Sequence, residues 1–213
     1  MNQHRLSACS VLLRKSQQSV TGFEFYLVRR AATLEFMGGF QVFPGGKVDP
    51  GDHQVNIQGL DEHQAIYCCA ARELLEEAGV LIARGPKQSA DKISAMRQSL
   101  LDQTKTWNEI LEENDLSLHA DDFINLGRWV TPPYTPVRFD ALYLASSLPE
   151  GQEPSIIDGE LTEGIWLTPE QAIADHNAGK AQITYPVLET LREMITQEGA
   201  LETVAQVMGE RKE

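Results

Sequence analysis

Hydrophobic and polar positions alternate over two stretches near the start of the chain. Residues 6–13 and 23–30 are rich in β-branched, aromatic and aliphatic side chains, and a polar turn containing Gly22 separates them. This pattern predicts an antiparallel pair of strands. Three further strands are predicted in the second half of the chain, at 122–130, at 138–145 and, shorter, ending at Trp166 and Leu167.

Apolar positions spaced three and four residues apart predict helices elsewhere. One helix is expected over 61–79, because Asp61 and Glu62 favour its N-terminus and Gly79 suits its C-cap. The stretch 89–115 is also helical in pattern. These two helical segments lie between the first pair of predicted strands and the strands of the second half.

The C-terminal part of the chain is expected to be helical. Pro169 fits the first turn of a helix capped by Thr168, and the tail is expected to hold two helices over about 186–208. The chain has no internal repeat, low-complexity tract or linker, and 213 residues suit one domain better than two. We therefore expect a single α+β domain over residues 1–213.

Charge and apolar run lengths limit the partners of this chain. The formal net charge is −13, and so acidic a protein repels the phosphate backbone of nucleic acids. No apolar run is long enough to span a membrane. A small phosphorylated substrate stays compatible, because a bound divalent cation reverses the local field. Cys9, Cys68 and Cys69 form no C-x-x-C pair, so they indicate buried thiols in a reducing, cytoplasmic setting.

Three glutamates on the helix expected over 61–79 are the candidates for chemistry. Glu73, Glu76 and Glu77 fall within about one hundred degrees of arc on a helix of 3.6 residues per turn. Like charges at these spacings repel each other unless a cation neutralises them. Carboxylate oxygens suit Mg²⁺ or Mn²⁺. An acidic helix face is often merely solvated, so the cluster alone does not establish a metal site.

The sequence around these glutamates matches a known pattern. R-E-L-L-E-E-A-G-V at 72–80 agrees at every fixed position with the second half of the Nudix box, G-x5-E-x7-R-E-U-x-E-E-x-G-U, where U is aliphatic. F-P-G-G-K at 43–47 resembles the segment that opens the box in many members. The chain is thus similar to the Nudix hydrolases. The resemblance implies an α/β/α sandwich around a mixed sheet, with a box loop and helix over 43–80 and a helical insertion over about 88–116.

The resemblance also implies a site. Gly46 would offer its backbone carbonyl, and Glu73, Glu76 and Glu77 their carboxylates, to Mg²⁺ or Mn²⁺. The implied reaction is the attack of water on one phosphorus of a diphosphate in a small nucleotide substrate. The ions would neutralise developing charge and acidify the water, and the protein would contribute positioning and electrostatics.

Residues outside the box are further candidates. A carboxylate from a distant loop commonly completes such sites as base or extra ligand, and Glu160 is the first choice here, with Glu163 second. Arg29, Arg30 and Arg138 could clamp phosphates through paired hydrogen bonds. Each of these five could also be an ordinary surface or salt-bridge residue.

The first half of the box departs from the pattern. One glutamate should lie six residues after Gly46 and eight before Arg72, but these counts reach Asp52 and Gln64 respectively, so about a dozen residues are inserted. In the family, that glutamate usually orients the arginine. The sequence leaves open whether Arg72 pairs with Glu76 one turn on, or with Asp52 if the insertion folds back.

Segments between about residues 25 and 170 resemble the acyl-CoA diphosphatase branch, which includes mammalian peroxisomal enzymes and carries an expanded box. The matches are L-V-R-R at 27–30, F-M-G-G-F-Q-V-F-P-G-G at 36–46, W-V-T-P at 129–132 and R-F-D at 138–140. This resemblance favours CoA or an acyl-CoA as substrate. The chain ends in R-K-E, so a peroxisomal address of the S-K-L type is not expected.

Two alternatives stay open. The first is a Nudix enzyme that acts on ADP-ribose, NADH or a nucleoside triphosphate. The second is a non-catalytic Nudix module that binds a nucleotide, although a pure binding module has no need of three mutually repelling glutamates. The sequence also leaves a homodimer open.

Overall fold

A computed structural model describes residues 4–135 and 137–196 of the chain. Within these ranges, seven strands form one mixed sheet in the order β3-β2-β1-β8-β7, with β4 joined to β1 and β9 joined to β2. The strands of this sheet are β1 (Arg5–Lys15), β2 (Phe23–Arg30), β3 (Gln41–Val42), β4 (Gly45–Lys47), β7 (Ile124–Val130), β8 (Phe139–Ser147) and β9 (Leu161–Leu167). The strands predicted from hydrophobic alternation are confirmed.

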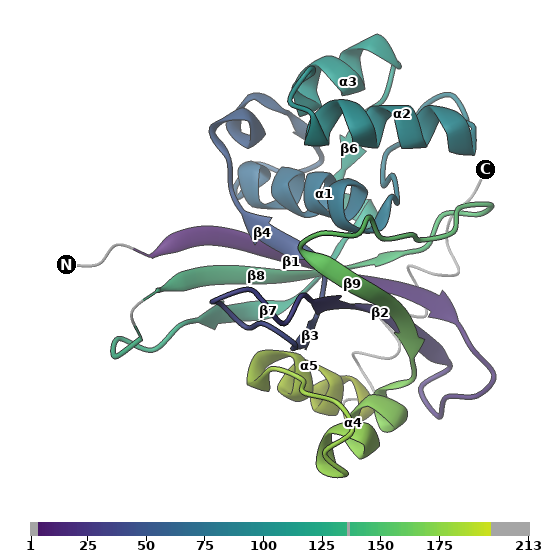
Figure 1. Ribbon diagram of the computed structural model, residues 1–213. Helices are drawn as coiled ribbons and strands as arrows, with labels where there is room; N and C mark the ends of the chain where they lie inside the picture. Colours follow the sequence, from purple (N-terminus) through teal and green to yellow (C-terminus); the bar gives the residue numbers. More distant parts are fainter. Residues whose placement is uncertain (1–3, 136, 197–213) are drawn as a thin grey trace.

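Helices cover both faces of this sheet, as Figure 1 shows. On one face lies α1 (Gln64–Ala78), with α2 (Ala90–Leu101) and α3 (Trp107–Glu113) stacked outside it; on the other lie α4 (Pro169–Asn177) and α5 (Tyr185–Thr196). Short elements connect them: the 3-10 helices η1 (Pro50–Gln54) and η2 (Ala120–Asp122), and a small parallel pair, β5 (Ile57–Gln58) with β6 (Leu118–His119). The arrangement confirms the expected α/β/α sandwich.

The central strand β1 explains why both faces are covered. Ala8 and Leu12 belong to the core packed around α1, whereas Val11 and Leu13 belong to the core packed around α5. A strand that is apolar on both faces must be buried on both, since its side chains alternate in direction. No helix in the described ranges is long and apolar enough to cross a membrane.

The predicted helical stretch over 89–115 consists of two helices, α2 and α3. α2 ends at Leu101, and Gln103 adopts a positive φ of 54°, which an α-helix does not accommodate. The side chain of Thr106 then accepts a hydrogen bond from the Glu109 N–H, and Glu109 reciprocates, so a capping box starts α3 at Trp107. Apolar periodicity continues through the break, and this is why the pattern did not reveal it.

The ends of the other helices can be compared with their predictions. α1 begins at Gln64 rather than at Asp61, because His63 has a left-handed conformation, with φ of 62°. The predicted C-cap is confirmed, since Gly79 is left-handed and donates to the carbonyls of the last turn. Thr168 caps α4 as predicted. Of the tail over about 186–208, the structure describes a single helix up to Thr196, and the rest lies outside the described residues.

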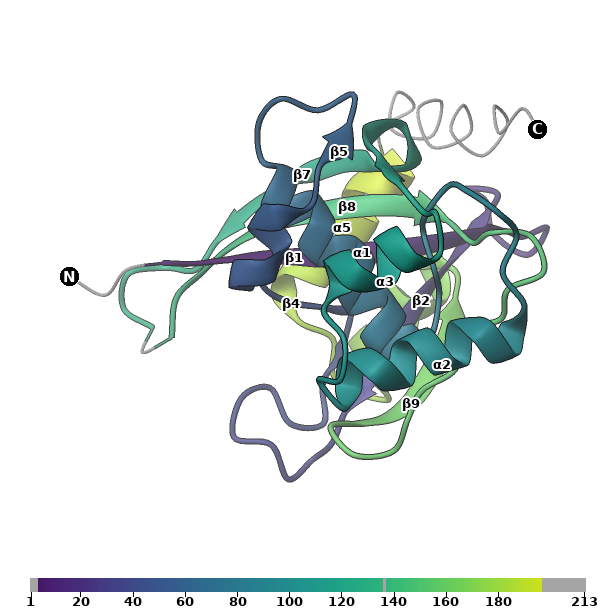
Figure 2. The same cartoon turned by 90° about the horizontal axis from the view of Figure 1, so that it is seen from above.

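β1 and β2 diverge, and β4 pairs with β1 in the space between them. β1 pairs with β2 only at its C-terminal end, from Leu13 to Lys15, while Ser7 to Cys9 pair instead with β4. α1 packs over β1 and β4 at this point. The Gly-rich segment and the glutamates of α1 are therefore held against each other. Figure 2 shows α2 and α3 lying over α1, seen from above.

Candidate active site

The backbone of β4 lies directly against two glutamates of α1. The Gly45 N–H donates a hydrogen bond to the Glu77 carboxylate at 2.9 Å. A Cβ atom placed on Gly46 would lie 2.2 Å from Glu73 Oε1, closer than any real contact. Glycine is therefore required at residue 46 for the Glu73 carboxylate to occupy its place.

Arg72 connects the glycine-rich segment to the remaining carboxylates. Its guanidinium donates to the Asp52 carboxylate through Nε and Nη2, at 2.9 and 3.0 Å, and to the Lys47 carbonyl at 3.0 Å. Its Nη1 donates to Glu73 at 2.9 Å and to Glu76 at 3.2 Å. Arg72 thus pairs with both residues that the sequence left open as its partner, Glu76 and Asp52. Of the two, Asp52 is the buried one, only 1% exposed.

Burial dominates the electrostatics of the carboxylates. It raises the pKa of Glu73 to about 7, with Arg72 opposing the shift and Glu76 adding to it. Burial likewise raises the pKa of Glu77 to about 8; the charge of Glu73 adds to this shift, and the Gly45 hydrogen bond opposes it. The pKa of Glu76 is raised by burial as well, against the effect of Arg72. The cluster is short of positive charge.

The donor set fits a divalent cation in kind. In the described ranges, no group of three or more His, Cys, Asp or Glu side chains is arranged to hold a metal ion. Glu73 and Glu76 are hydrogen-bonded to Arg72 instead. However, buried oxygen donors with raised pKa values favour the arrival of positive charge, and carboxylate oxygens are the ligands that Mg²⁺ prefers. The carbonyl of Gly46, by contrast, lies 3.6 Å from the Cys69 thiol.

Two candidates from outside the box lie near this cluster. The charges of Arg30 and Glu160 both act on Glu77, the arginine lowering its pKa and the glutamate raising it. The pairing of β2 with β9 explains this, because the Ala31 N–H donates to the Glu160 carbonyl at 2.8 Å where the two strands meet. Tertiary structure thus brings Arg30 and Glu160 to the box helix.

The remaining candidates are placed differently. Arg29 donates to Glu163 at 2.8 Å. These two residues face each other across the β2–β9 ladder, next to the position of Arg30, and their charges neutralise each other. Arg138 precedes β8, and its Nε is buried without a hydrogen-bond partner among the described residues. Among the described residues, no hydrogen bond or ion pair joins Arg138 to the glutamates, so its guanidinium remains a candidate because its Nε donor is unused.

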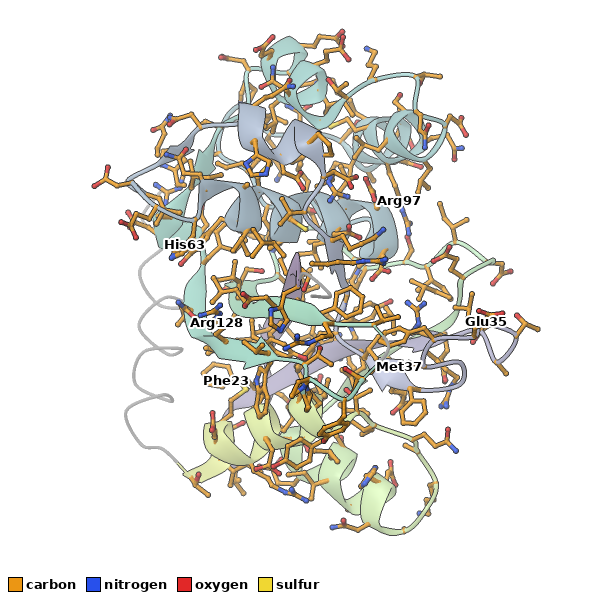
Figure 3. The ribbon with its side chains drawn as sticks, turned by 90° about the vertical axis from the view of Figure 1, so that its left-hand side faces the viewer. Phe23, Glu35, Met37, His63, Arg97 and Arg128 are labelled. Carbon is orange, nitrogen blue, oxygen red and sulfur yellow. The ribbon has the colours of Figure 1, made fainter. Side chains whose placement is uncertain are left out.

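Arg97 contributes to the site although it lies outside the box. It extends from α2 to the end of α1, where it is labelled in Figure 3. Its guanidinium donates to the carbonyls of Glu76 and Glu77 at 2.9 and 3.0 Å, and to the Ser155 carbonyl at 2.9 Å. These carbonyls have no partner within the helix. A signal was present in the sequence, because Arg97 falls in helical register with Ile93 and Leu100 on the buried face.

Two of the three cysteines agree with their interpretation as buried residues, and Cys9 is half-buried. All three are free, and Cys68 and Cys69 are buried in α1. Burial raises the pKa of Cys9 to about 12 and that of the other two further. A thiol with so high a pKa does not act as a nucleophile at neutral pH.

Comparison with known proteins decides the family. The sequence profile of the NUDIX domain family matches residues 3–188. The chain belongs to the Nudix hydrolase family. Members of this family generally use divalent metal ions such as Mg²⁺. A NUDIX hydrolase from Alicyclobacillus acidocaldarius is similar to this Nudix chain, with 25% identity and a TM-score of 0.80 over 95% of this chain and 97% of that one.

Two other proteins are similar to this chain over part of their length or in fold. “Putative nudix hydrolase 7” from Caenorhabditis elegans is 26% identical over 163 residues, which cover 75% of this chain and 52% of that protein. The Nudix chain described here therefore spans about half the length of this curated relative. A MutT NUDIX hydrolase from Burkholderia pseudomallei is 13% identical, with a TM-score of 0.51 over 90% of this chain and 98% of that one, and shows the shared fold alone.

Proposed function

We propose that this Nudix chain is a Mg²⁺- or Mn²⁺-dependent hydrolase that cleaves the diphosphate bond of a nucleoside diphosphate linked to a second group. The observation that carries the proposal is the position of Glu77. Its carboxylate is buried, accepts a hydrogen bond from Gly45 and lies in the fields of Glu73 and Glu160. Such a group of acidic oxygens suits a divalent cation that also binds phosphate oxygens.

The residues would divide the work as follows. Glu73, Glu76, Glu77 and the carbonyl of Gly46 would hold the cation, which when bound neutralises phosphate charge and acidifies water. Arg72 would keep Glu73 and Glu76 oriented through the hydrogen bonds described above. These roles concern positioning and electrostatics, which dominate phosphoryl chemistry.

Outside the box, Glu160 would accept a proton from the attacking water or bind the cation as an outer ligand. Arg30 and Arg138 would donate to phosphate oxygens. Arg29 is the least available of the three arginines, because Glu163 already occupies its Nε.

CoA or a short acyl-CoA is the favoured substrate, on the resemblance of residues 25–170 to the acyl-CoA diphosphatases. The products would be a phosphopantetheine and adenosine 3′,5′-bisphosphate. The 3′-phosphate adds charge that ADP-ribose lacks, and Arg30 or Arg138 would recognise it through paired hydrogen bonds. ADP-ribose, NADH and nucleoside triphosphates are the competing substrates.

The decisive experiment compares kcat/KM for CoA, dephospho-CoA, ADP-ribose, NADH and ATP under identical Mg²⁺. We expect CoA to exceed dephospho-CoA by about 10- to 100-fold, as a lost charged hydrogen bond implies. Removal of the metal with EDTA should abolish turnover, and Mg²⁺ or Mn²⁺ should restore it. An advantage of tenfold or more for ADP-ribose or NADH would refute the CoA assignment, and activity that persists in excess EDTA would refute the metal dependence.

A further inference from the structure

A cavity of about 620 Å³ opens beside the carboxylate cluster, on the side of α1 that faces the inserted helices. Arg72 and Glu76 contribute to its wall from α1, and Asp49 to Asp52 contribute from the segment that holds Arg72. The outer wall comes from the end of α2, the loop that follows it and the start of α3. The cavity therefore exists because α2 and α3 are packed outside α1, as Figure 1 shows.

The outer wall is apolar only in part: Leu100, Leu101 and Trp107 lie among polar residues of the loop. Leu100 and Trp107 are buried beneath it, and Leu101 leaves 43% of its surface exposed. Pro50 lines the opposite side. An apolar ligand that covered Leu101 and this surface would gain free energy in proportion to the area removed from water.

The charges around the cavity disfavour an anion. Two of the described residues that line it are cations, and both are engaged: Arg72 with Asp52, and Lys105 with Glu113. The acidic side chain of Asp49 is 64% exposed, and Glu109 is acidic as well. A phosphate placed here would meet negative charge and no unpaired cation of this wall, whereas an uncharged ligand would meet neither penalty.

Glu76 belongs to both places. It is one of the three carboxylates of the cluster, and it also lines the cavity. We infer that the cavity binds the uncharged, partly apolar group that the substrate carries on the side of the diphosphate away from the nucleoside. This inference rests on the proposed function and names the class of substrate that the site prefers.

The other half of the substrate is directed away from the cavity. Glu73 and Glu77 face β4, and Arg30 acts on Glu77 from β2. A nucleoside that carries an additional phosphate would pair that phosphate with the guanidinium of Arg30, on the opposite side of the cluster from α3. An extended neutral chain is therefore preferred over a second sugar phosphate or a bare terminal phosphate as the second group.

The test uses three probes with the same adenosine diphosphate half: the octyl ester of ADP, ADP-ribose and ATP. kcat/KM is measured with Mg²⁺ for the wild type, for Leu101→Glu and for the matched control Val20→Glu. Val20 is 81% exposed in the turn between β1 and β2, outside the cavity lining. Binding of the non-hydrolysable α,β-methylene analogue of the octyl ester and of ADP-ribose is measured by calorimetry in parallel.

The wild type should prefer the octyl ester over ADP-ribose by at least about tenfold, the scale set by a few methylene groups in an apolar pocket. Leu101→Glu should remove most of this preference and leave ADP-ribose almost unchanged, and Val20→Glu should alter neither. If Leu101→Glu does not fold, Thr104→Trp fills the cavity from its exposed loop and should have the same effect.

The outcomes separate the two proposals. Hydrolysis of all probes without a preference, or an equal loss for both in Leu101→Glu, overturns the cavity assignment and leaves the hydrolase intact. A tenfold binding preference with no hydrolysis contradicts the proposed function and leaves the cavity assignment standing. Failure of both binding and hydrolysis overturns both.

Discussion

Asp52 and Arg72 are joined by two hydrogen bonds, 2.9 and 3.0 Å long, between a carboxylate and a guanidinium that are both almost fully buried. Asp52 lies six residues after Gly46, where the box pattern has a glutamate, and an insertion then separates it from Arg72. The same guanidinium holds Glu73 and Glu76. Asp52 therefore orients two of the candidate metal ligands through Arg72.

Asp52→Ala should destabilise the fold strongly. The substitution leaves a buried guanidinium without its main partner, and breaking such a pair costs about 3–5 kcal/mol. Urea unfolding of the metal-free protein measures the change. Glu62→Ala is the control, because the side chain of Glu62 is 87% exposed and its removal should change stability by less than about 0.5 kcal/mol. Similar stabilities for the two variants would mean that Arg72 is held by its other partners.

Gly46→Ala should impair activity far more than stability. Its Cβ would displace the Glu73 carboxylate, the far end of a flexible side chain that can move at small cost, so unfolding should change by only about 1 kcal/mol. Turnover should fall by about a hundredfold or more, as for loss of a precisely placed group. Gly51→Ala is the matched control for stability, since a Cβ at Gly51 meets nothing within 4 Å. Full activity in Gly46→Ala would exclude Glu73 from the site.

Arg97→Met should weaken both the fold and the binding of Mg²⁺. Loss of the guanidinium strands the carbonyls of Glu76 and Glu77, at about 1–3 kcal/mol for each buried unsatisfied group. Because the carboxylates on the same residues then lose their support, Mg²⁺ affinity should fall by about 10- to 100-fold. Calorimetric titration with Mg²⁺ provides the readout. Lys92→Met, on the exposed side of the same helix, should leave the affinity unchanged; an equal effect would point to α2 as a whole rather than to Arg97.

Glu160→Gln should lower kcat far more than it raises KM, because a base or outer ligand acts mainly in the transition state. Glu163→Gln should be milder, since the Glu163 carboxylate is bound to Arg29 and not to the cluster. Steady-state kinetics on the best substrate from the screen compares the two. The reverse ranking would assign the role of base or outer ligand to Glu163. If neither variant changed kcat, the loop that carries both residues would have no catalytic role.

The pH dependence follows from the raised pKa values of Glu73 and Glu77, about 7 and 8 against an ordinary value of 4.5. Between the ordinary pKa of 4.5 and the raised values of about 7 and 8, the folded, metal-free protein binds more protons at these two residues than the unfolded chain does. The contribution of these two groups to stability is thus complete below about pH 4.5 and is lost as the pH rises to about 8. Since Mg²⁺ binds the ionised carboxylates, its affinity should rise over the same interval.

Thermal unfolding between pH 5 and 8 in EDTA checks this expectation. Glu77→Gln cannot ionise at residue 77, so its Tm should fall less steeply with pH than that of the wild type. Glu62→Gln, with an exposed side chain, should follow the wild type. Parallel curves for all three proteins would show that the Glu77 carboxyl is ionised throughout this range.

Sequence patterns predicted the elements of the site better than their connections. The helix that carries Glu73, Glu76 and Glu77 and its C-cap at Gly79 follow from periodicity and local backbone chemistry, which act within a few residues. The stretch over 89–115 is helical as expected, but its division into α2 and α3 did not follow from the pattern, because the capping box at Thr106 starts a new helix without interrupting the apolar periodicity. Local rules thus identify elements more reliably than their breaks.

By itself, the sequence determined the strands and the acidic face of α1, since each depends on the conformation or repeat of a short segment. Only the tertiary structure decided that Arg72 takes Asp52, that Arg97 supports the end of α1, and that the inserted helices enclose a cavity beside Glu76. These relationships join residues 20 or more positions apart. Their geometry depends on how layers pack, and packing brings together side chains that no periodicity along the chain relates.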